Sequence, residues 1–190
     1  MSPDRAIYVL WAAWAVSWFI AARWANATVK RPGFSNEILY RVVQGVGVLL
    51  LFSLIPPRMR FAAPDWVAPA SIRWAMVAVA AAGFLFCWWA RIHLGRLWSG
   101  TVTRKADHHV VDTGPDAIVR HPIYTGIIAA AFATVVARGT YLSLLGAVLI
   151  VVGFWIKARL EERFLRTELG AEAYDTYARK TAMLVPFVRW

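Results

Sequence analysis

Hydrophobic residues fill five stretches of the chain that contain no Asp, Glu, Lys or Arg. These stretches cover residues 6–22, 42–57, 74–90, 122–137 and 139–156. A helix needs ~17–25 mainly apolar residues to cross a bilayer, and polar side chains at its ends can reach the interface. The pattern therefore predicts an all-α integral membrane protein with about five transmembrane helices.

Only Arg138 separates the last two stretches. A continuous helix through both would be ~50 Å long at ~1.5 Å per residue, whereas the hydrocarbon core of a bilayer is only ~30 Å thick. We therefore predict a hairpin that turns at residues 138–140, where Gly139 supplies the backbone freedom that a tight turn needs.

Beyond residue 156 the pattern changes to that of an amphipathic helix. Apolar residues recur at helical spacing at Leu160, Phe164, Leu165 and Leu169, with charges between them. Gly170 is expected to end this C-terminal helix, and a second short helix would carry Tyr174 and Tyr177. The apolar segment 183–188 contains Pro186, so we expect it to be a strap that lies back on the protein or the membrane.

The distribution of basic residues predicts the orientation. With the N-terminus outside, the inner segments hold sixteen Lys and Arg residues and the outer segments hold five. Basic residues favour the cytoplasmic side, so the C-terminus and its amphipathic helix are expected in the cytoplasm, at a bacterial inner membrane. We expect a single membrane domain over residues 1–190, with a three-helix N-terminal part (1–93) and a second part (94–190).

Composition supports a membrane protein and excludes several classes of site. The chain is 59% hydrophobic and has 11 Trp, and its net charge is +10. Because the basic residues flank apolar runs, lipid head groups account for them better than nucleic acid does. A single cysteine, Cys87, excludes an internal disulfide and a cysteine-based zinc cluster, and we expect it to be a buried, inert thiol.

The segment Arg120-His121-Pro122, followed by Tyr124, stands at the start of the fourth apolar stretch. Proline suits the first turn of a helix, and the free N–H groups of a helix N-terminus favour an anion. Arg120 and His121 add donors there. The segment therefore predicts either a carboxylate or phosphate site or an anchor for lipid phosphates.

Two adjacent acids, Glu161 and Glu162, follow the fifth stretch. Pairing with Lys157 and Arg159 on an exposed helix face is one interpretation. However, adjacent side chains point ~100° apart on a helix, so at least one should turn toward the bundle. A carboxylate at that depth indicates function, and it could hold an ammonium or a sulfonium group.

A pair of histidines, His108 and His109, precedes the short run 110–115. Three interpretations remain open: a polar loop, a zinc site that lacks a convincing third ligand, and a loop whose backbone contacts a cofactor. No dinucleotide fingerprint or P-loop motif accompanies it.

Taken in order, these motifs resemble the isoprenylcysteine carboxyl methyltransferase family of integral membrane enzymes, and phospholipid methyltransferases share a similar pattern. The resemblance extends from about Leu94 to the end of the chain, and it implies that residues 94–190 are the cofactor-binding catalytic part. It rests on these residues: His108, His109, Val110, Val111, Gly114, Arg120, His121, Pro122, Tyr124, Gly126, Glu161, Glu162, Gly170, Tyr174, Tyr177, Pro186 and Phe187.

The resemblance implies S-adenosylmethionine as cofactor, bound without a soluble Rossmann domain. The cofactor-binding residues would be His108, His109, Val110, Val111, His121, Pro122, Ile123, Tyr124, Glu161 and Glu162. The catalytic residues would be Arg120, His121, Tyr124 and Arg159. The family has an arginine one turn before the glutamate, where this chain has Lys157, and Asp116 stands where many relatives have an aromatic residue.

The resemblance also implies a lipophilic acceptor, most simply the carboxylate of an isoprenylcysteine-like molecule that enters from the bilayer. N-methylation of a phospholipid amine is an alternative. A non-catalytic membrane protein that binds haem through His93 and His121 is an alternative from another class.

Overall fold

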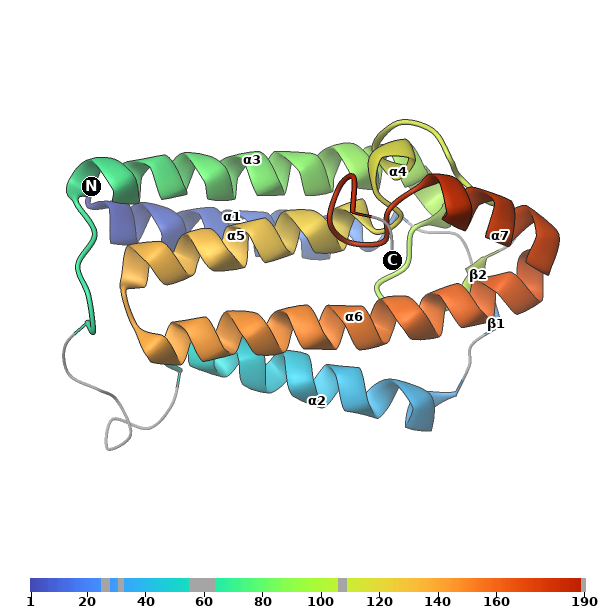
Figure 1. The fold of residues 1–190 in the computed structure, drawn as a ribbon, viewed down its shortest axis with the longest axis horizontal. Helices are drawn as coiled ribbons and strands as arrows, with labels where there is room; N and C mark the ends of the chain where they lie inside the picture. The colour runs from blue at the N-terminus through green and yellow to red at the C-terminus, as the bar shows by residue number, and fades with distance from the viewer. Residues whose placement is uncertain (25–27, 31–32, 55–63, 106–108, 189–190) are drawn as a thin grey trace.

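Five long helices form the body of the protein and run back and forth along its long axis (Figure 1). The computed structural model describes residues 1–24, 28–30, 33–54, 64–105 and 109–188. The long helices are α1 (Pro3–Ala21), α2 (Phe34–Leu51), α3 (Ala70–Leu94), α5 (Pro122–Arg138) and α6 (Tyr141–Leu169). The short elements are β1 (Thr28–Lys30), η2 (Gly95–Leu97), β2 (Arg104–Lys105), α4 (Pro115–Ile118) and α7 (Ala171–Lys180), and β1 pairs with β2 in antiparallel orientation.

The predicted hairpin between the last two apolar stretches is confirmed. Helix α5 begins at Pro122 and ends at Arg138, and Gly139 follows in the left-handed conformation with φ 63°. Glycine is required here for two reasons. The left-handed conformation is unfavourable for other residues, and an added Cβ would collide with the backbone carbonyl of Trp66.

The predicted C-terminal helices are confirmed as well. Helix α6 continues without a break from the apolar stretch to Leu169, and Gly170 ends it with φ 97°. Helix α7 then carries Tyr174 and Tyr177, which are both buried. Consequently, α6 extends beyond the length of a membrane span and carries Glu161 and Glu162 past the end of the apolar bundle.

The prediction for the second stretch was wrong in its bounds. Helix α2 covers Phe34–Leu51 rather than 42–57, and the last part of the predicted range, 55–57, lies outside the described residues. A charge-free window breaks at every charged residue, but Glu37 and Arg41 are one helical turn apart and form an ion pair within α2. The pair lets the helix begin earlier than the hydrophobic pattern indicates.

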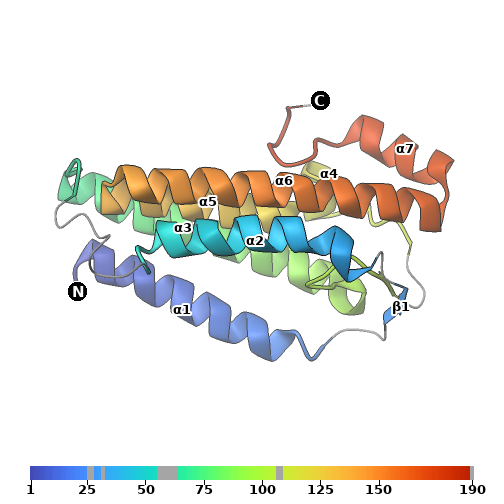
Figure 2. The ribbon, with the colours of Figure 1, turned by 90° about the horizontal axis from the view of Figure 1, so that it is seen from below.

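Glycines allow the helices to pack closely in two pairs. Helix α3 packs along α5, with Gly83 against Gly126, and α2 packs along α6, with Gly47 against Gly146 (Figures 1 and 2). Small residues at such crossings are typical of membrane helices, because the backbones must approach closely where lipid gives no hydrophobic driving force. Helices of residues 1–93 therefore interleave with those of residues 94–190.

Apolar side chains point outward along the bundle, as expected of helices that face lipid. Examples on different helices are Phe19 (79% exposed), Leu85 (70%) and Leu145 (51%). Within the described residues, the helical segments Ala70–Leu97 and Tyr141–Leu169 are long and apolar enough to cross a membrane, and α5 is a shorter apolar helix. The outward-facing apolar surface and these helices indicate a membrane protein.

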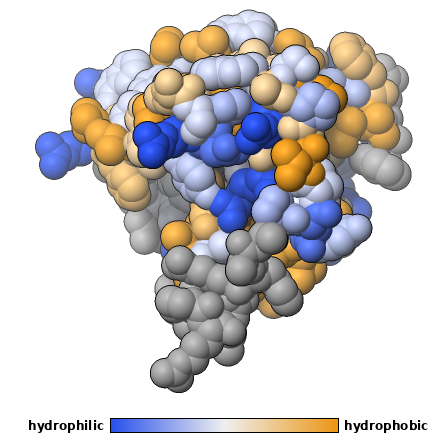
Figure 3. All heavy atoms as spheres, turned by 90° about the vertical axis from the view of Figure 1, so that its left-hand side faces the viewer, coloured by the Kyte–Doolittle hydropathy of each residue, from blue (hydrophilic) through white to orange (hydrophobic). Residues whose placement is uncertain are grey.

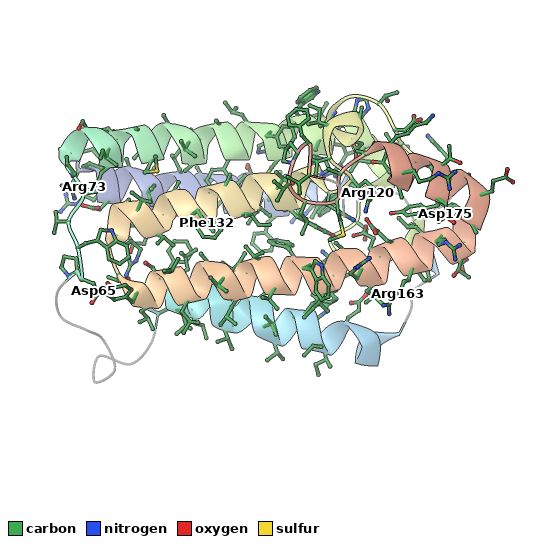
Figure 4. All side chains as sticks on the ribbon, viewed as in Figure 1. Asp65, Arg73, Arg120, Phe132, Arg163 and Asp175 are labelled. Atoms are coloured by element: carbon green, nitrogen blue, oxygen red, sulfur yellow. The ribbon has the colours of Figure 1, made fainter. Side chains whose placement is uncertain are left out.

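Charged groups gather instead at the two ends of the bundle. One end carries Asp65 and an ion pair between Asp4 and Arg73, and Figure 3 shows hydrophilic side chains grouped there. The other end carries Arg120, Arg163 and Asp175 (Figure 4). The elements α4 and α7 fold over this second end, which holds the predicted site.

Candidate functional site

An open pocket lies at the end of the bundle where α3 and α6 end and α5 begins. Its cavity volume is about 110 Å³, and the pocket opens to solvent. The pocket is lined by Leu94, Leu97, Trp98, Ser99, Thr103, His109, Val110, Val111, Asp116, Arg120, His121, Pro122, Ile123, Tyr124, Glu161, Leu165, Leu169, Tyr174 and Tyr177. Most of the predicted cofactor-binding residues are therefore brought together from separate parts of the chain.

The C-terminal strap holds the Arg120-His121 segment in place. The Arg120 backbone N–H donates to the Ala182 carbonyl at 2.8 Å, and the His121 N–H donates to the Met183 carbonyl at 3.2 Å. The Thr125 hydroxyl donates to the Leu184 carbonyl at 2.7 Å. Because Met183 and Leu184 are buried in the core, the predicted return of this segment onto the protein is confirmed.

Glu162 neutralises the basic residues at the start of α5. The Arg120 Nε donates to Glu162 Oε1 at 2.7 Å, and the His121 Nε2 lies 3.2 Å from the same oxygen. Arg120 also donates to the Ala178 carbonyl at 2.9 Å and to the Thr181 carbonyl. Arg120 therefore ties α5, α6 and α7 together, and its guanidinium is already engaged where we predicted a donor to an anion.

Glu161, and not Glu162, lines the pocket. The Tyr124 hydroxyl donates to Glu161 Oε2 at 2.6 Å, and the His121 Nδ1 lies 3.9 Å from that oxygen. The imidazole of His121 stacks on the Tyr124 ring with 5.0 Å between centroids, and Tyr124 stacks on Phe154 at 4.6 Å. This column of rings fixes the carboxylate of Glu161, whose side chain is 25% exposed, at the pocket wall.

Lys157 and Arg159 lie on different faces of α6. Lys157 is buried, donates to the Gly100 carbonyl at 2.9 Å, and its Nζ lies 5.0 Å from the centre of the Tyr124 ring. Arg159 is exposed and lies over the Trp155 ring. It does not line the pocket, so the prediction that it belongs to the site was wrong. The helix explains the difference: residue 157 is four positions from Glu161 and shares its face, whereas two positions correspond to ~200° of rotation.

Asp116 is a buried acid in the pocket wall. It is 5% exposed, and its Oδ2 has no hydrogen-bond partner within the described part of the chain. Burial, together with the negative charge of Glu161, raises the pKa of Asp116 to about 7. The Tyr177 hydroxyl donates to the backbone carbonyl of Asp116 at 2.8 Å, which joins α7 to α4, and burial raises the pKa of Tyr177.

The histidine pair is only partly described. His109, Val110 and Val111 line the pocket, as predicted, and His108 lies outside the described residues. No group of three His, Cys, Asp or Glu side chains that could hold a metal ion occurs in the described ranges. Of the two histidines considered for haem, His93 pairs through Nε2 with the Thr113 hydroxyl at 2.9 Å, and His121 faces Glu161 and Glu162.

Sequence reasoning missed part of the pocket. Leu165 and Leu169 follow Glu161 at intervals of four residues and share its helix face, a spacing that could have identified them. By contrast, Trp98, Thr103 and Asp116 reach the pocket through loops and a short helix that carry no periodic signal, and Leu94 lies at the very end of α3. Cys87 is buried as predicted and donates to the Ile123 carbonyl at 3.3 Å.

The chain matches a known protein family. The model of the isoprenylcysteine carboxyl methyltransferase family matches residues 75–167, from the first turns of α3 to the last turn of α6. These residues include the α5 N-terminus, Glu161 and Glu162. No curated protein matches the chain.

Proposed function

Because this chain belongs to the isoprenylcysteine carboxyl methyltransferase family, a family of membrane methyltransferases, we propose that it uses S-adenosylmethionine to methylate a lipophilic acceptor. The proposed acceptor group is the carboxylate of an isoprenylcysteine-like molecule, and the product is a methyl ester. The active site is the pocket between α5, α6 and α7.

The observation that carries this proposal is the contact of Tyr124 with Glu161 in the wall of the open pocket at the end of the bundle. Both residues lie in the range that matches the family. The tyrosine hydroxyl holds the carboxylate of Glu161 beside an open space at the end of an apolar bundle, where it can pair with a cationic ligand.

The residues of the pocket fit the proposed cofactor. S-adenosylmethionine carries a sulfonium, an ammonium and a carboxylate beside its nucleoside. Glu161 offers a carboxylate to a cation, and the first turn of α5 leaves N–H groups that favour an anion. Trp98, Tyr174 and Tyr177 supply aromatic surface, against which a nucleobase or a sulfonium can pack.

When bound, S-adenosylmethionine would supply a methyl group on a sulfonium. An acceptor oxygen would attack the methyl carbon in line, so that the new O–C bond forms as the S–C bond breaks and the sulfur leaves as a neutral sulfide. An ionised carboxylate acceptor needs no general base. The work of the protein is then alignment and exclusion of water. The stacked rings of His121, Tyr124 and Phe154 form a rigid wall for alignment, and the apolar side chains of Leu94, Leu165 and Leu169 exclude water.

Lys157 is the residue that we propose to attract the acceptor carboxylate. Its ammonium is buried beside the Tyr124 ring, on the face of α6 that also carries Glu161. The hydrocarbon tail of the acceptor would remain between the outward-facing apolar helices and enter sideways from the bilayer. We propose that all five long helices span the bilayer, with the pocket and the C-terminus on the cytoplasmic side, where the basic residues concentrate.

The test combines a binding and a transfer measurement on the purified protein in detergent. Calorimetry should detect saturable binding of S-adenosylmethionine that Glu161→Ala and His121→Ala abolish, whereas Glu172→Ala on the exposed face of α7 should bind normally. Radiolabelled methyl transfer to prenylcysteine analogues should give a base-labile product. Lys157→Met should raise the KM for the acceptor, and the matched change Arg159→Met should leave it unaltered.

Three outcomes would contradict the proposal. Unchanged binding in both the Glu161 and the His121 variants would remove the site assignment. A base-stable product formed on phospholipid amines would replace ester formation by N-methylation. A Soret band in the purified protein would support haem binding instead.

A further inference from the structure

Asp116 lines the pocket and has a buried carboxyl oxygen without a hydrogen-bond partner in the described part of the chain. Only 5% of the residue is exposed, and the oxygen in question is Oδ2. A buried polar atom without a partner is destabilising, and more so when the group is charged, so native proteins keep few of them. A bound ligand could therefore supply the hydrogen-bond donor or the positive charge that this oxygen lacks.

The groups around Asp116 leave it without a positive neighbour. Glu161 on α6 faces it with a negative charge. Tyr177 on α7 donates to its backbone carbonyl and not to its carboxyl group. At the start of α5, the guanidinium of Arg120 and the Nε2 of His121 are directed to Glu162.

The remaining titratable groups of the pocket do not change this balance. Tyr174 on α7 also lines it, and burial raises the pKa of this phenol, so it stays neutral. His109 lines the pocket from the loop before α4 and is exposed. Asp116 and Glu161 thus form an electrostatic environment that favours a cation between them.

We propose that the Asp116 carboxylate recognises the cationic centre of the methyl donor and makes donor binding depend on the charge of this residue. The inference rests on the proposed function, because it takes the sulfonium and ammonium of S-adenosylmethionine as the available cations.

The pH dependence follows from the same contact. In the empty pocket the pKa of Asp116 is raised to about 7, so roughly half of the molecules carry a protonated Asp116 at neutral pH. A cation binds only the ionised form well, and the affinity for S-adenosylmethionine should therefore rise about tenfold between pH 6 and pH 8. Binding near pH 7 should release roughly half a proton per site.

The experiment compares donor and product by calorimetry, using the wild type, Asp116→Asn and the control Asp112→Asn. Asp112 lies four residues earlier in the chain, is exposed, and does not line this pocket. We expect Asp116→Asn to bind S-adenosylmethionine about tenfold more weakly at pH 8 and to lose most of the pH dependence and the proton release. Asp112→Asn should behave as the wild type.

S-adenosylhomocysteine identifies which cation is recognised, because it keeps the ammonium and lacks the sulfonium. A shared pH dependence would point to the ammonium, and a dependence confined to S-adenosylmethionine would point to the sulfonium. Unchanged affinity and pH dependence in Asp116→Asn would overturn the inference while leaving the proposed function intact. Absence of wild-type binding at every pH would overturn both. Proton release by the wild type, measured in two buffers of different ionisation enthalpy, provides a second test that needs no variant.

Discussion

Replacing Gly126 by alanine should destabilise the crossing of α3 and α5 and disturb the pocket beside it. A Cβ at position 126 would lie 2.4 Å from the carbonyl oxygen of Gly83 and 2.6 Å from the sulfur of Cys87. Ordinary contacts begin at 3.4 Å, so the two helices would have to separate by about 1 Å. The atoms in the way are backbone and a buried thiol, which cannot rotate aside as a flexible side chain would.

The size of the effect follows from two opposing terms. Overpacking of a tight interface costs ~1–3 kcal/mol, and the clash with backbone puts Gly126→Ala near the upper limit. Alanine is better than glycine in a helix by up to ~1 kcal/mol. The net loss is then about 2 kcal/mol, which lowers the Tm of a protein of this size by about 4–8 °C.

Gly45→Ala is the matched control. Gly45 also lies inside an apolar helix, α2, but an added Cβ would meet nothing within 4 Å. Only the gain in helix propensity remains, so its Tm should stay the same or rise by up to ~4 °C. Thermal unfolding in detergent, followed by tryptophan fluorescence, measures both variants under identical conditions.

Ligand binding gives a second measurement for the same pair. Tyr124 lies two residues before Gly126, so separation of α5 from α3 should displace the ring that holds Glu161. We expect weaker S-adenosylmethionine binding in Gly126→Ala and normal binding in Gly45→Ala. A Gly126→Ala protein as stable as the Gly45→Ala protein would refute the reasoning about the helix crossing.

Two further predictions concern buried charge. Asp116→Asn should stabilise the ligand-free protein as pH rises: the folded-state pKa is raised from 3.8 to about 7, so folding with the native acid becomes less favourable across that range. The gain in the free energy of unfolding should be small near pH 4 and reach its maximum of about 4 kcal/mol above pH 7, and the Tm should rise with it; a constant Tm difference at all pH values would contradict this. Arg91 is fully buried and donates to the carbonyls of Ala21, Trp24 and Gly95. Arg91→Leu leaves these carbonyls without a donor, at ~1–3 kcal/mol for each buried unsatisfied group, and should lower the Tm far more than Arg96→Leu at an exposed site; equal Tm values for the two variants would contradict this.

Much of the helical architecture could be predicted from local patterns. The hairpin at Gly139, the end of α6 at Gly170 and the start of α5 at Pro122 each depend on the conformational limits of one residue. These limits act wherever the residue occurs, so they can be read without knowledge of the tertiary contacts. The bounds of α2 could not be predicted in this way. Glu37 and Arg41 form an ion pair within the helix, and a search for charge-free stretches does not detect such a pair.

The chemistry of the site was predictable in its residue types and less so in its geometry. The motifs around His121 and Glu161 predict that basic, aromatic and acidic groups take part. They do not decide which of two adjacent glutamates faces the pocket, or that Arg120 is engaged by Glu162 and by the carbonyls at the end of α7. Those outcomes depend on how α6 is rotated against α5 and on where the C-terminal strap returns.

The sequence by itself determined the segments that form apolar helices, the turns between the last two, and the residue types of a site at one end of the bundle. Only the tertiary structure decided that Lys157 rather than Arg159 lies beside Tyr124, and that Asp116 is buried in the pocket with an unpaired oxygen. The physical reason is the range of the forces. Periodicity and turn preference act between neighbours in the chain, whereas the pairing and burial of a charge depend on helices that are brought together from distant parts of the chain.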